Sequence, residues 1–248
     1  MQKDIKLIAI DLDGTLLDRN HEISEQNKNA IQRAKDQGLQ VVISTGRSLS
    51  TCHDLIKPLG ESAYFVTING GEIYDQHLKL VERHVIDHND MQHLWNITKQ
   101  YNPFFWSSTV QGRFNTDQPF EKKVEDYEWL KYGFEIEDDE LRETILQELQ
   151  DHAAFEITNS SPTNIEINPA GINKAAALRK VTKWLNLSMG QVMAIGDSLN
   201  DMAMIREAGF GVAMGNAQEY VQKEADWITA TNEENGVAKA IDQILHST

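Results

Sequence analysis

The 248-residue sequence contains one cysteine, no apolar run long enough to span a membrane, and little positive charge, with 23 Lys and Arg against 38 Asp and Glu. Cys52 has no partner for an internal disulfide, and one thiol alone is no metal framework, so we expect a reducing compartment, by default the cytoplasm. The first apolar segment is too short to be a signal sequence.

The formal net charge of −15 argues against nucleic acid and anionic membranes as partners, because both would repel the protein at long range. An acidic protein that handles phosphate must therefore do so locally, through a metal ion and a few placed cations. The composition, 40% hydrophobic and 25% charged, is ordinary for a globular protein of one or two domains. We expect a monomer or a homodimer.

The chain is organised around a four-residue apolar run, residues 7–10, that ends in two carboxylates, a glycine and a hydroxyl: Asp11-Leu12-Asp13-Gly14-Thr15. Four apolar residues without polar alternation predict a strand covered on both faces, as in a parallel α/β sheet. Ligands of such sheets bind at the carboxyl ends of the strands. Asp11 and Asp13 are therefore candidate functional residues, although a strand followed by an ordinary turn has the same local pattern.

Further apolar runs alternate with helical patterns, which predicts right-handed crossovers and a Rossmann-like parallel sheet in an α/β fold. The expected strands are 39–43, 64–68, 192–195 and 210–213, with a hairpin over 72–81 and an edge strand at 227–228. Ser24 is expected to cap the first helix, and Asn216 with Glu219 to form a capping box for a later one.

The alternation is lost between residues 83 and 168, which indicates an inserted α+β domain, while 1–82 and 169–248 form the core. In the insertion we expect helices over 89–101 and 138–151, a hairpin over 104–116, and strands over 154–158 and 164–168. His84, His88 and His93 do not share one helix face, so we do not expect them to bind a metal.

Three other segments of the core carry polar or charged residues that could take part in a functional site. Strand 39–43 leads into Ser44-Thr45-Gly46-Arg47, whose hydroxyls, backbone and cation suit a phosphate oxygen. Lys174 lies in a first helical turn, where a positive charge is unfavourable unless an anion is near. Strand 192–195 ends in Gly196-Asp197-Ser198-Leu199-Asn200-Asp201, which repeats the design of the first strand.

Asp11, Asp13, Asp197 and Asp201 would meet at one edge of the sheet, where uncompensated carboxylates repel one another. A divalent cation, most simply Mg²⁺, would balance them, since carboxylates and phosphate oxygens are its usual ligands. Thr45, Lys174 and Asn200 could then donate to the phosphate. Asp11 would act as a nucleophile that forms an aspartyl-phosphate, and Asp13 would alternate as acid and base.

These motifs, in this order, resemble the haloacid dehalogenase superfamily of aspartate-nucleophile phosphatases. Thr45-Gly46-Arg47, Asn69-Gly70, Glu166-Ile167 and the position of the insertion are similar to the Cof-type group with a type IIB cap. The resemblance implies that Asp11, the carbonyl of Asp13, and Asp197 hold Mg²⁺, with Asp201 supporting them. It also implies that the phosphate is held by five residues: Leu12, Thr45, Gly46, Lys174 and Asn200.

The expected activity is Mg²⁺-dependent hydrolysis of a small phosphorylated metabolite, a phosphomonoester such as a sugar phosphate, with the cap setting specificity. A flavin-pathway phosphate and pyridoxal phosphate are equally open as substrates. A phosphosugar mutase of the same superfamily would carry the same motifs but need a bisphosphate activator. A non-catalytic phosphometabolite sensor is a third possibility, although binding alone does not need both Asp11 and Asp13.

Overall fold

The structure is a computed structural model that describes residues 4–246. It divides into two compact units, a core of Met1–Glu82 with Lys174–Thr248 and a cap of Arg83–Asn173. The chain returns from the cap to the core at residue 174. The sequence predicted this return at residue 169. Residues up to Pro169 belong to a cap strand, and the amide of Ala170 donates to the carbonyl of Ala154 in the same unit.

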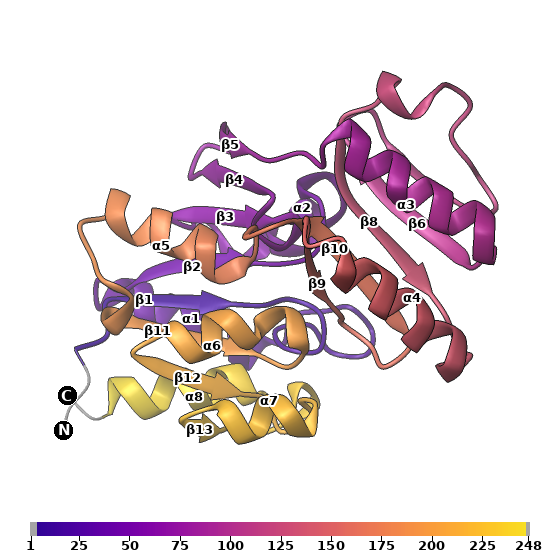
Figure 1. Ribbon diagram of the computed structural model, residues 1–248. Coiled ribbons are helices and arrows are strands. Elements are labelled where there is room, and N and C mark those ends of the chain that lie inside the picture. The colour runs from indigo at the N-terminus through magenta and orange to yellow at the C-terminus, as the bar shows by residue number, and fades with distance from the viewer. Residues whose placement is uncertain (1–3, 247–248) are drawn as a thin grey trace. The chain divides into compact units, whose positions relative to one another are not determined.

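The core contains an eight-stranded sheet in the order β13-β12-β11-β1-β2-β3-β4-β5, and β1 lies at its centre (Figure 1). Strands β1, β2, β3, β11, β12 and β13 are parallel, and β4 runs antiparallel to β3. The strands are β1 (Leu7–Ile10), β2 (Gln40–Ser44), β3 (Tyr64–Thr67), β4 (Glu72–Asp75), β5 (Leu80–Arg83), β11 (Val192–Gly196), β12 (Phe210–Ala213) and β13 (Trp227–Ile228).

The two faces of this sheet are covered by different helices because alternate residues of each buried strand point to opposite faces. Ile8 and Ile10 of β1 pack in one cluster with residues of α1 (Glu25–Asp36), α2 (Leu49–Ile56) and α8 (Gly236–Leu245). Leu7 and Ala9 pack in the other cluster with α5 (Lys174–Trp184). Helices α6 (Met202–Glu207) and α7 (Glu219–Glu224) complete the core, which confirms the predicted Rossmann-like α/β fold.

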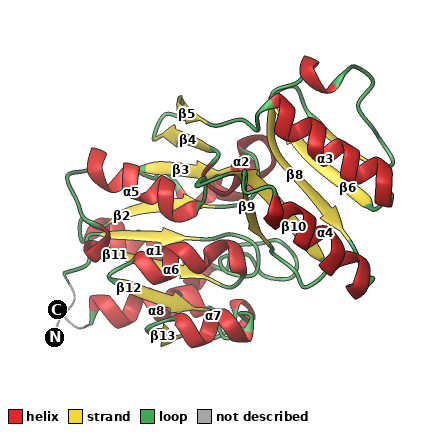
Figure 2. Cartoon of the chain, in the orientation of Figure 1, coloured by secondary structure: helices red, strands yellow, loops and turns green. Residues whose placement is uncertain are grey.

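The cap is a five-stranded antiparallel sheet, in the order β7-β6-β8-β10-β9, whose apolar face packs against two helices. Its strands are β6 (Phe104–Thr109), β7 (Arg113–Asn115), β8 (Trp129–Glu135), β9 (Phe155–Thr158) and β10 (Asn164–Pro169), and its helices are α3 (His88–Tyr101) and α4 (Asp139–Asp151) (Figure 2). This is the inserted α+β arrangement expected from the sequence.

The central cap strand, β8, was not predicted. Its sequence, WLKYGFE, contains a lysine and a glycine where a buried strand would normally carry apolar residues. In the structure Lys131 forms a buried ion pair with Glu166 at 2.7 Å. Gly133 is required because the Trp106 ring lies 2.3 Å from the position a Cβ would take. Both exceptions depend on neighbouring strands, which a local pattern cannot indicate.

Helix capping follows the prediction at one position and departs from it at another. The Ser24 hydroxyl accepts the amide of Asn27 at the start of α1, as expected. The prediction that Asn216 and Glu219 form a capping box is wrong, because Gln218 is the N-cap of α7. Asn216 instead bridges two loops: its side chain donates to the carbonyl of Gly14 and accepts the amide of Asn232.

No helix within residues 4–246 has both the length and the apolar character needed to cross a bilayer.

Candidate active site

The adjacent strands β1 and β11 bring the carboxylates at their ends together. The strands pair in register from Leu7 with Val192 to Ile10 with Ile195, and the amide of Asp11 continues the pairing by donating to the carbonyl of Ile195. Oxygens of Asp11, Asp197 and Asp201 all lie within 4.8 Å of one another, and across the described residues they are the one such group of acidic, histidine or cysteine side chains.

A lysine lies in direct contact with this carboxylate cluster. Lys174 is the first residue of α5 and is fully buried. Its Nζ donates to Asp11 Oδ1 at 2.6 Å and to Asp201 Oδ1 at 2.7 Å. Burial opposes the positive charge, but the two carboxylates outweigh it and raise the pKa of Lys174. The unfavourable position of this lysine in the sequence is therefore explained by the anions that surround it.

The single ammonium group of Lys174 does not balance three carboxylates. The excess negative charge helps to raise the pKa values of Asp11 and Asp197. Burial and the carboxylates of Asp201 and Asp197 hold the pKa of Asp11 well above its usual value, although Lys174 acts in the opposite direction. Burial, reinforced by Asp201, raises the pKa of Asp197 to about 7. A divalent cation fits this donor set because its charge would replace a proton, and hard oxygen ligands suit such an ion.

Asp201 is hydrogen-bonded to the groups around it through both of its carboxylate oxygens. Its Oδ2 accepts the backbone amides of Asp197, at 3.0 Å, and Ser198, at 3.2 Å, so the carboxylate closes the turn that carries Asp197. Gly196 allows this closure, because a Cβ there would lie 2.4 Å from the Asp201 side chain. Because Oδ1 accepts a hydrogen bond from Lys174 Nζ, both oxygens of Asp201 are hydrogen-bonded.

Gly14 and Thr15, the glycine and the hydroxyl that follow Asp13, approach Asp197 in the structure, and neither of these two contacts was predicted from the sequence. The hydroxyl of Thr15 donates to Asp197 Oδ1 at 2.8 Å, which links the β1 and β11 loops. Gly14 has φ +78°, and a Cβ there would lie 2.5 Å from Asp197 Oδ2. Their place directly after Asp13 was the available signal, but only the pairing of β1 with β11 shows which carboxylate they approach.

The side chain of Asp13 stands apart from the three-carboxylate cluster. It forms a two-point ion pair with Arg47, with Nε to Oδ2 at 2.7 Å and Nη2 to Oδ1 at 2.5 Å. Arg47 was expected to add positive charge beside a phosphate, but in this structure its guanidinium is paired with Asp13 instead. The side-chain carboxylates that group within 4.8 Å are those of Asp11, Asp197 and Asp201, and the metal role expected of Asp13, through its carbonyl, stays a prediction.

Four of the five residues predicted to bind phosphate lie on the loops that follow β1, β2 and β11, and the fifth, Lys174, is the first residue of α5. Thr45 is fully buried, and its hydroxyl accepts the amide of Arg47 at 3.2 Å. Leu12 is buried, and its carbonyl accepts the amides of Leu16 and Leu17. Asn200 is buried and accepts the hydroxyl of Ser198 at 3.3 Å. Gly46 directly follows Thr45 and is partly exposed. Their phosphate contacts stay predictions.

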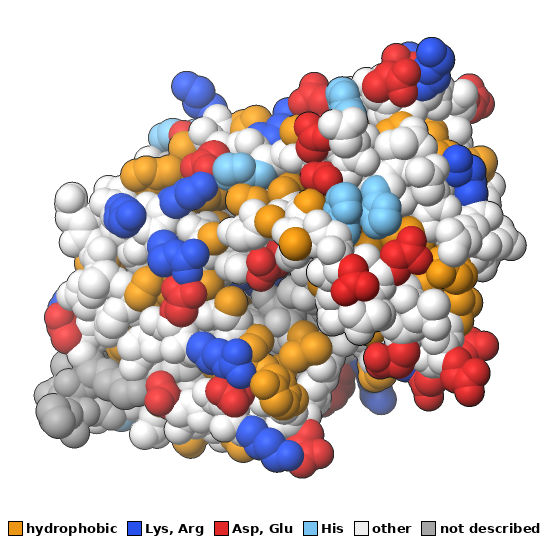
Figure 3. Space-filling view, viewed as in Figure 1, with side chains coloured by type: hydrophobic (Ala, Val, Ile, Leu, Met, Phe, Trp, Pro, Cys, Tyr) orange, Lys and Arg blue, Asp and Glu red, His pale blue; other side chains and the backbone are white. Residues whose placement is uncertain are grey.

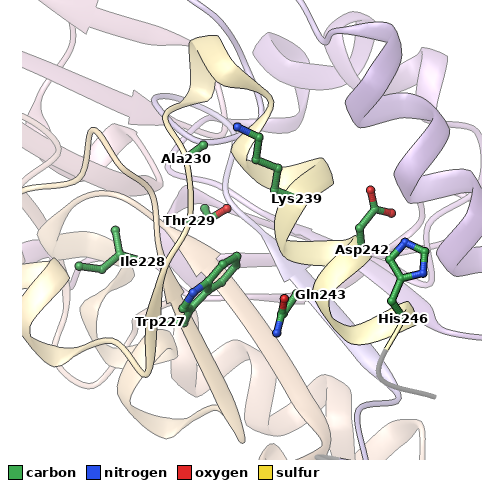
Figure 4. Close-up of a pocket in the computed structure, with 8 residues that line it drawn as sticks. All are labelled: Trp227, Ile228, Thr229, Ala230, Lys239, Asp242, Gln243 and His246. Carbon is green, nitrogen blue, oxygen red and sulfur yellow. The ribbon is translucent and has the colours of Figure 1, made fainter.

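A separate cavity of about 410 Å³ lies between β13 and α8 (Figure 4). Its lining includes Trp227, Ile228, Lys239 and Asp242, and none of the predicted site residues. Asp242 is already paired with Arg33 at 2.5 Å. The reaction centre is therefore assigned to the carboxylate cluster and not to this cavity.

A Rossmann-like core with an α+β insertion and a carboxylate–lysine cluster at its strand ends is the arrangement that the motifs predicted for a hydrolase of the haloacid dehalogenase type. The chain belongs to the haloacid dehalogenase-like hydrolases, whose family model matches residues 8–241. It is 55% identical over 238 residues to the 5-amino-6-(5-phospho-D-ribitylamino)uracil phosphatase YcsE of Bacillus subtilis, covering 96% of this chain and 95% of that one.

Solved structures agree with this assignment. A haloacid dehalogenase-like hydrolase from B. subtilis superposes with a TM-score of 0.88 at 27% identity, over 96% of this chain and 99% of that one. A subclass IIB sugar phosphatase shares the fold, with a TM-score of 0.83 at 22% identity over 96% and 98% of the two chains. The resemblance inferred from the motifs is thus confirmed, and the chain is a phosphatase.

Proposed function

We propose that this chain hydrolyses a small phosphorylated metabolite in the cytoplasm, with Mg²⁺, through an aspartyl-phosphate on Asp11. The observation that carries the proposal is the buried cluster of Asp11, Asp197 and Asp201 around Lys174. A buried site with more carboxylates than cations is suited to a divalent ion and a phosphoryl group that binds with it. On the face of the molecule that Figure 3 shows, acidic and basic side chains are mixed, and no uniform basic surface is present there.

Asp11 is the proposed nucleophile. Lys174 donates to its Oδ1, so we assign the attack on phosphorus to Oδ2. A bond forms between Oδ2 and phosphorus while the bond from phosphorus to the leaving oxygen breaks, and Asp13 gives that oxygen a proton. Asp13 then takes a proton from the water that hydrolyses the aspartyl-phosphate. Phosphate leaves, and both carboxyl groups return to their first state.

Asp11 and Asp197, with the carbonyl of Asp13, would hold the Mg²⁺. When bound, the ion neutralises charge that develops on the phosphoryl oxygens. We assign the remaining phosphoryl contacts to the amides of Leu12 and Gly46, the hydroxyl of Thr45, the ammonium of Lys174 and the side-chain amide of Asn200. Asp201 keeps Lys174 and the Asp197 turn in position through the hydrogen bonds described above.

For the substrate, we propose first the compound named for the 55% identical relative, 5-amino-6-(5-phospho-D-ribitylamino)uracil. It is a phosphomonoester of a polyol, so its departing alkoxide needs the proton that Asp13 would supply. A simple sugar phosphate, the example expected from the sequence, is the second choice. The phosphatase names of the relatives favour hydrolysis over a mutase or a sensor.

The test is phosphate release from a panel of both substrate types with Mg²⁺, with Ca²⁺, or with excess EDTA. We expect turnover with Mg²⁺ and no bisphosphate activator. Ca²⁺ should inhibit, because the larger ion takes more ligands at longer distances and would misplace Asp11 relative to phosphorus. Full activity in excess EDTA would contradict the metal assignment, and an absolute need for a bisphosphate would indicate a mutase.

A further inference from the structure

The ion pair between Arg47 and Asp13 connects the loops that follow β1 and β2. Arg47 Nε and Nη2 each contact a different oxygen of the Asp13 carboxylate, at 2.7 and 2.5 Å. This two-point geometry fixes the plane of the carboxylate as well as its distance, which a single contact would not do. The proton-transferring group of the proposed reaction is therefore held by both of its oxygens.

The backbone of Arg47 is itself held in place. Its amide donates to the Thr45 hydroxyl at 3.2 Å, and its carbonyl accepts the amide of Ile68 at 2.9 Å. On its exposed side, His21 Nδ1 lies 3.4 Å from Arg47 Nη2. A guanidinium on so fixed a backbone is well suited to orient a carboxylate on the neighbouring loop.

A contribution to the stability of the fold does not by itself explain the ion pair between Arg47 and Asp13. The side chain of Arg47 is 26% exposed and that of Asp13 is 44% exposed. Ion pairs so accessible to water contribute little to the free energy of unfolding. The pair also holds the Asp13 carboxylate outside the three-carboxylate cluster, in contrast to Lys174, which lies inside that cluster and is fully buried.

We propose that Arg47 is a positioning residue for Asp13, and that it acts on the proton transfers and not on the bond between Asp11 and phosphorus. The inference rests on the proposed function, in which Asp13 gives a proton to the leaving oxygen and later takes one from water. Arg47 contacts both oxygens of Asp13, so the oxygen that exchanges a proton gives up its contact during the transfer while the other contact keeps the carboxylate in place. The guanidinium neither gains nor loses a proton, because arginine stays charged.

This role predicts that the effect of Arg47→Ala depends on the leaving group. The parameter kcat/KM reports the steps up to loss of the leaving group. An alkyl phosphate such as ribitol 5-phosphate needs a proton at that stage, so its kcat/KM should fall about 10²-fold or more. p-Nitrophenyl phosphate has a leaving group that departs unprotonated, so its kcat/KM should change by less than about threefold. Its kcat should still fall, because the second step needs Asp13 as a base.

Rescue and control variants distinguish positioning from a general loss of structure. Added guanidinium should restore much of the alkyl-phosphate activity of Arg47→Ala. Arg47→Lys should recover only part, because an ammonium does not reproduce the planar two-point contact. Arg19→Ala is the matched control: this exposed arginine lies in the same loop as Asp13 but contacts Glu233, and its removal should leave both substrates unaffected.

Inorganic phosphate serves as the probe for the competing role of Arg47 in binding the phosphoryl group. Its inhibition constant should be the same in the wild type and in Arg47→Ala. A weaker phosphate inhibition, or an equal loss of kcat/KM on both substrates, would overturn the positioning role. The proposed function fails separately, if the wild-type enzyme with Mg²⁺ releases phosphate from neither substrate, and the inference that rests on it then fails too.

Discussion

At the residue scale, the site concentrates negative charge in a buried place, and this has a consequence for stability. In the absence of a divalent ion, the pKa of Asp197 lies at about 7 in the folded protein, above its usual value of 3.8. Between these pH values the Asp197 carboxyl therefore binds more protons in the folded state than in the unfolded state. The contribution of Asp197 to the free energy of unfolding must fall as pH rises from about 4 to 7, and stay lowered above that.

We therefore predict that Mg²⁺ raises the melting temperature more at pH 8 than at pH 5. At the higher pH the ion offsets charge repulsion, whereas at the lower pH it must displace a proton. Thermal unfolding at both pH values, with Mg²⁺ or with EDTA, measures the difference. In Asp197→Asn the dependence on Mg²⁺ should be largely lost. An equal effect of Mg²⁺ at both pH values in the wild type would contradict the metal assignment.

The sequence could predict which residues of this site carry charge, but not how all of them pair. Asp11, Asp197 and Lys174 follow from strand ends and a helix start, because strand order in a parallel sheet already determines their proximity. The pairing of Asp13 with Arg47 could not be predicted, because it depends on the distance between two loops and on one side chain's reach. For the same reason, the contact of Thr15 with Asp197 was not predicted.

At the element scale, the loop after β1 must pass very close to the loop after β11. We predict that Gly14→Ala lowers Mg²⁺ affinity and kcat, because the added Cβ would meet the Asp197 carboxylate at 2.5 Å. Gly38→Ala is a matched control. Gly38 has a similar φ of +85° but nothing within 4 Å of a Cβ, so both variants share the backbone strain of about 1–2 kcal/mol.

Melting temperature and the Mg²⁺ dependence of turnover should be measured on both glycine variants. Both variants should lose the stability that backbone strain costs, and Gly14→Ala should lose more because Asp197 must also move. Only Gly14→Ala should need more Mg²⁺. If Gly38→Ala showed the same change in Mg²⁺ dependence, backbone strain and not contact with Asp197 would explain the result.

Predictability also differs between elements. The strands of the core were predictable because β1 and β11 are short apolar runs buried on both faces, and their pattern does not depend on their neighbours. Strand β8 was missed because its lysine and glycine are accommodated by Glu166 and Trp106 on adjacent strands. The prediction that Asn216 caps a helix was wrong because its side chain contacts residues distant in the sequence.

At the scale of the whole molecule, every residue assigned to chemistry lies in the core unit and none in the cap. We predict that joining Glu82 to Asn173 through a short Gly/Ser linker leaves a core that slowly hydrolyses p-nitrophenyl phosphate. Glu82 is retained because it pairs with Lys180 in that unit. The shortened protein should lose its preference among larger phosphometabolites, because contacts that distinguish leaving groups have been removed.

Circular dichroism and the fluorescence of Trp184 and Trp227, both retained in the core, would verify that the shortened protein is folded. The comparison to make is the ranking of substrates by kcat/KM before and after removal of the cap. A folded core that kept the parent's ranking would show that specificity lies in the core.

The most direct test of the central claim is to trap the phosphoenzyme and locate the phosphoryl group. Asp13→Asn cannot take a proton from water, so with Mg²⁺ and p-nitrophenyl phosphate it should accumulate an aspartyl-phosphate. Rapid acid quench, intact mass and peptide mapping should then find one phosphoryl group on Asp11. Asp11→Asn should remain folded, acquire no phosphoryl group and lose about 10³-fold or more of its turnover. A phosphoryl group on another residue, or on Asp11→Asn itself, would contradict the account.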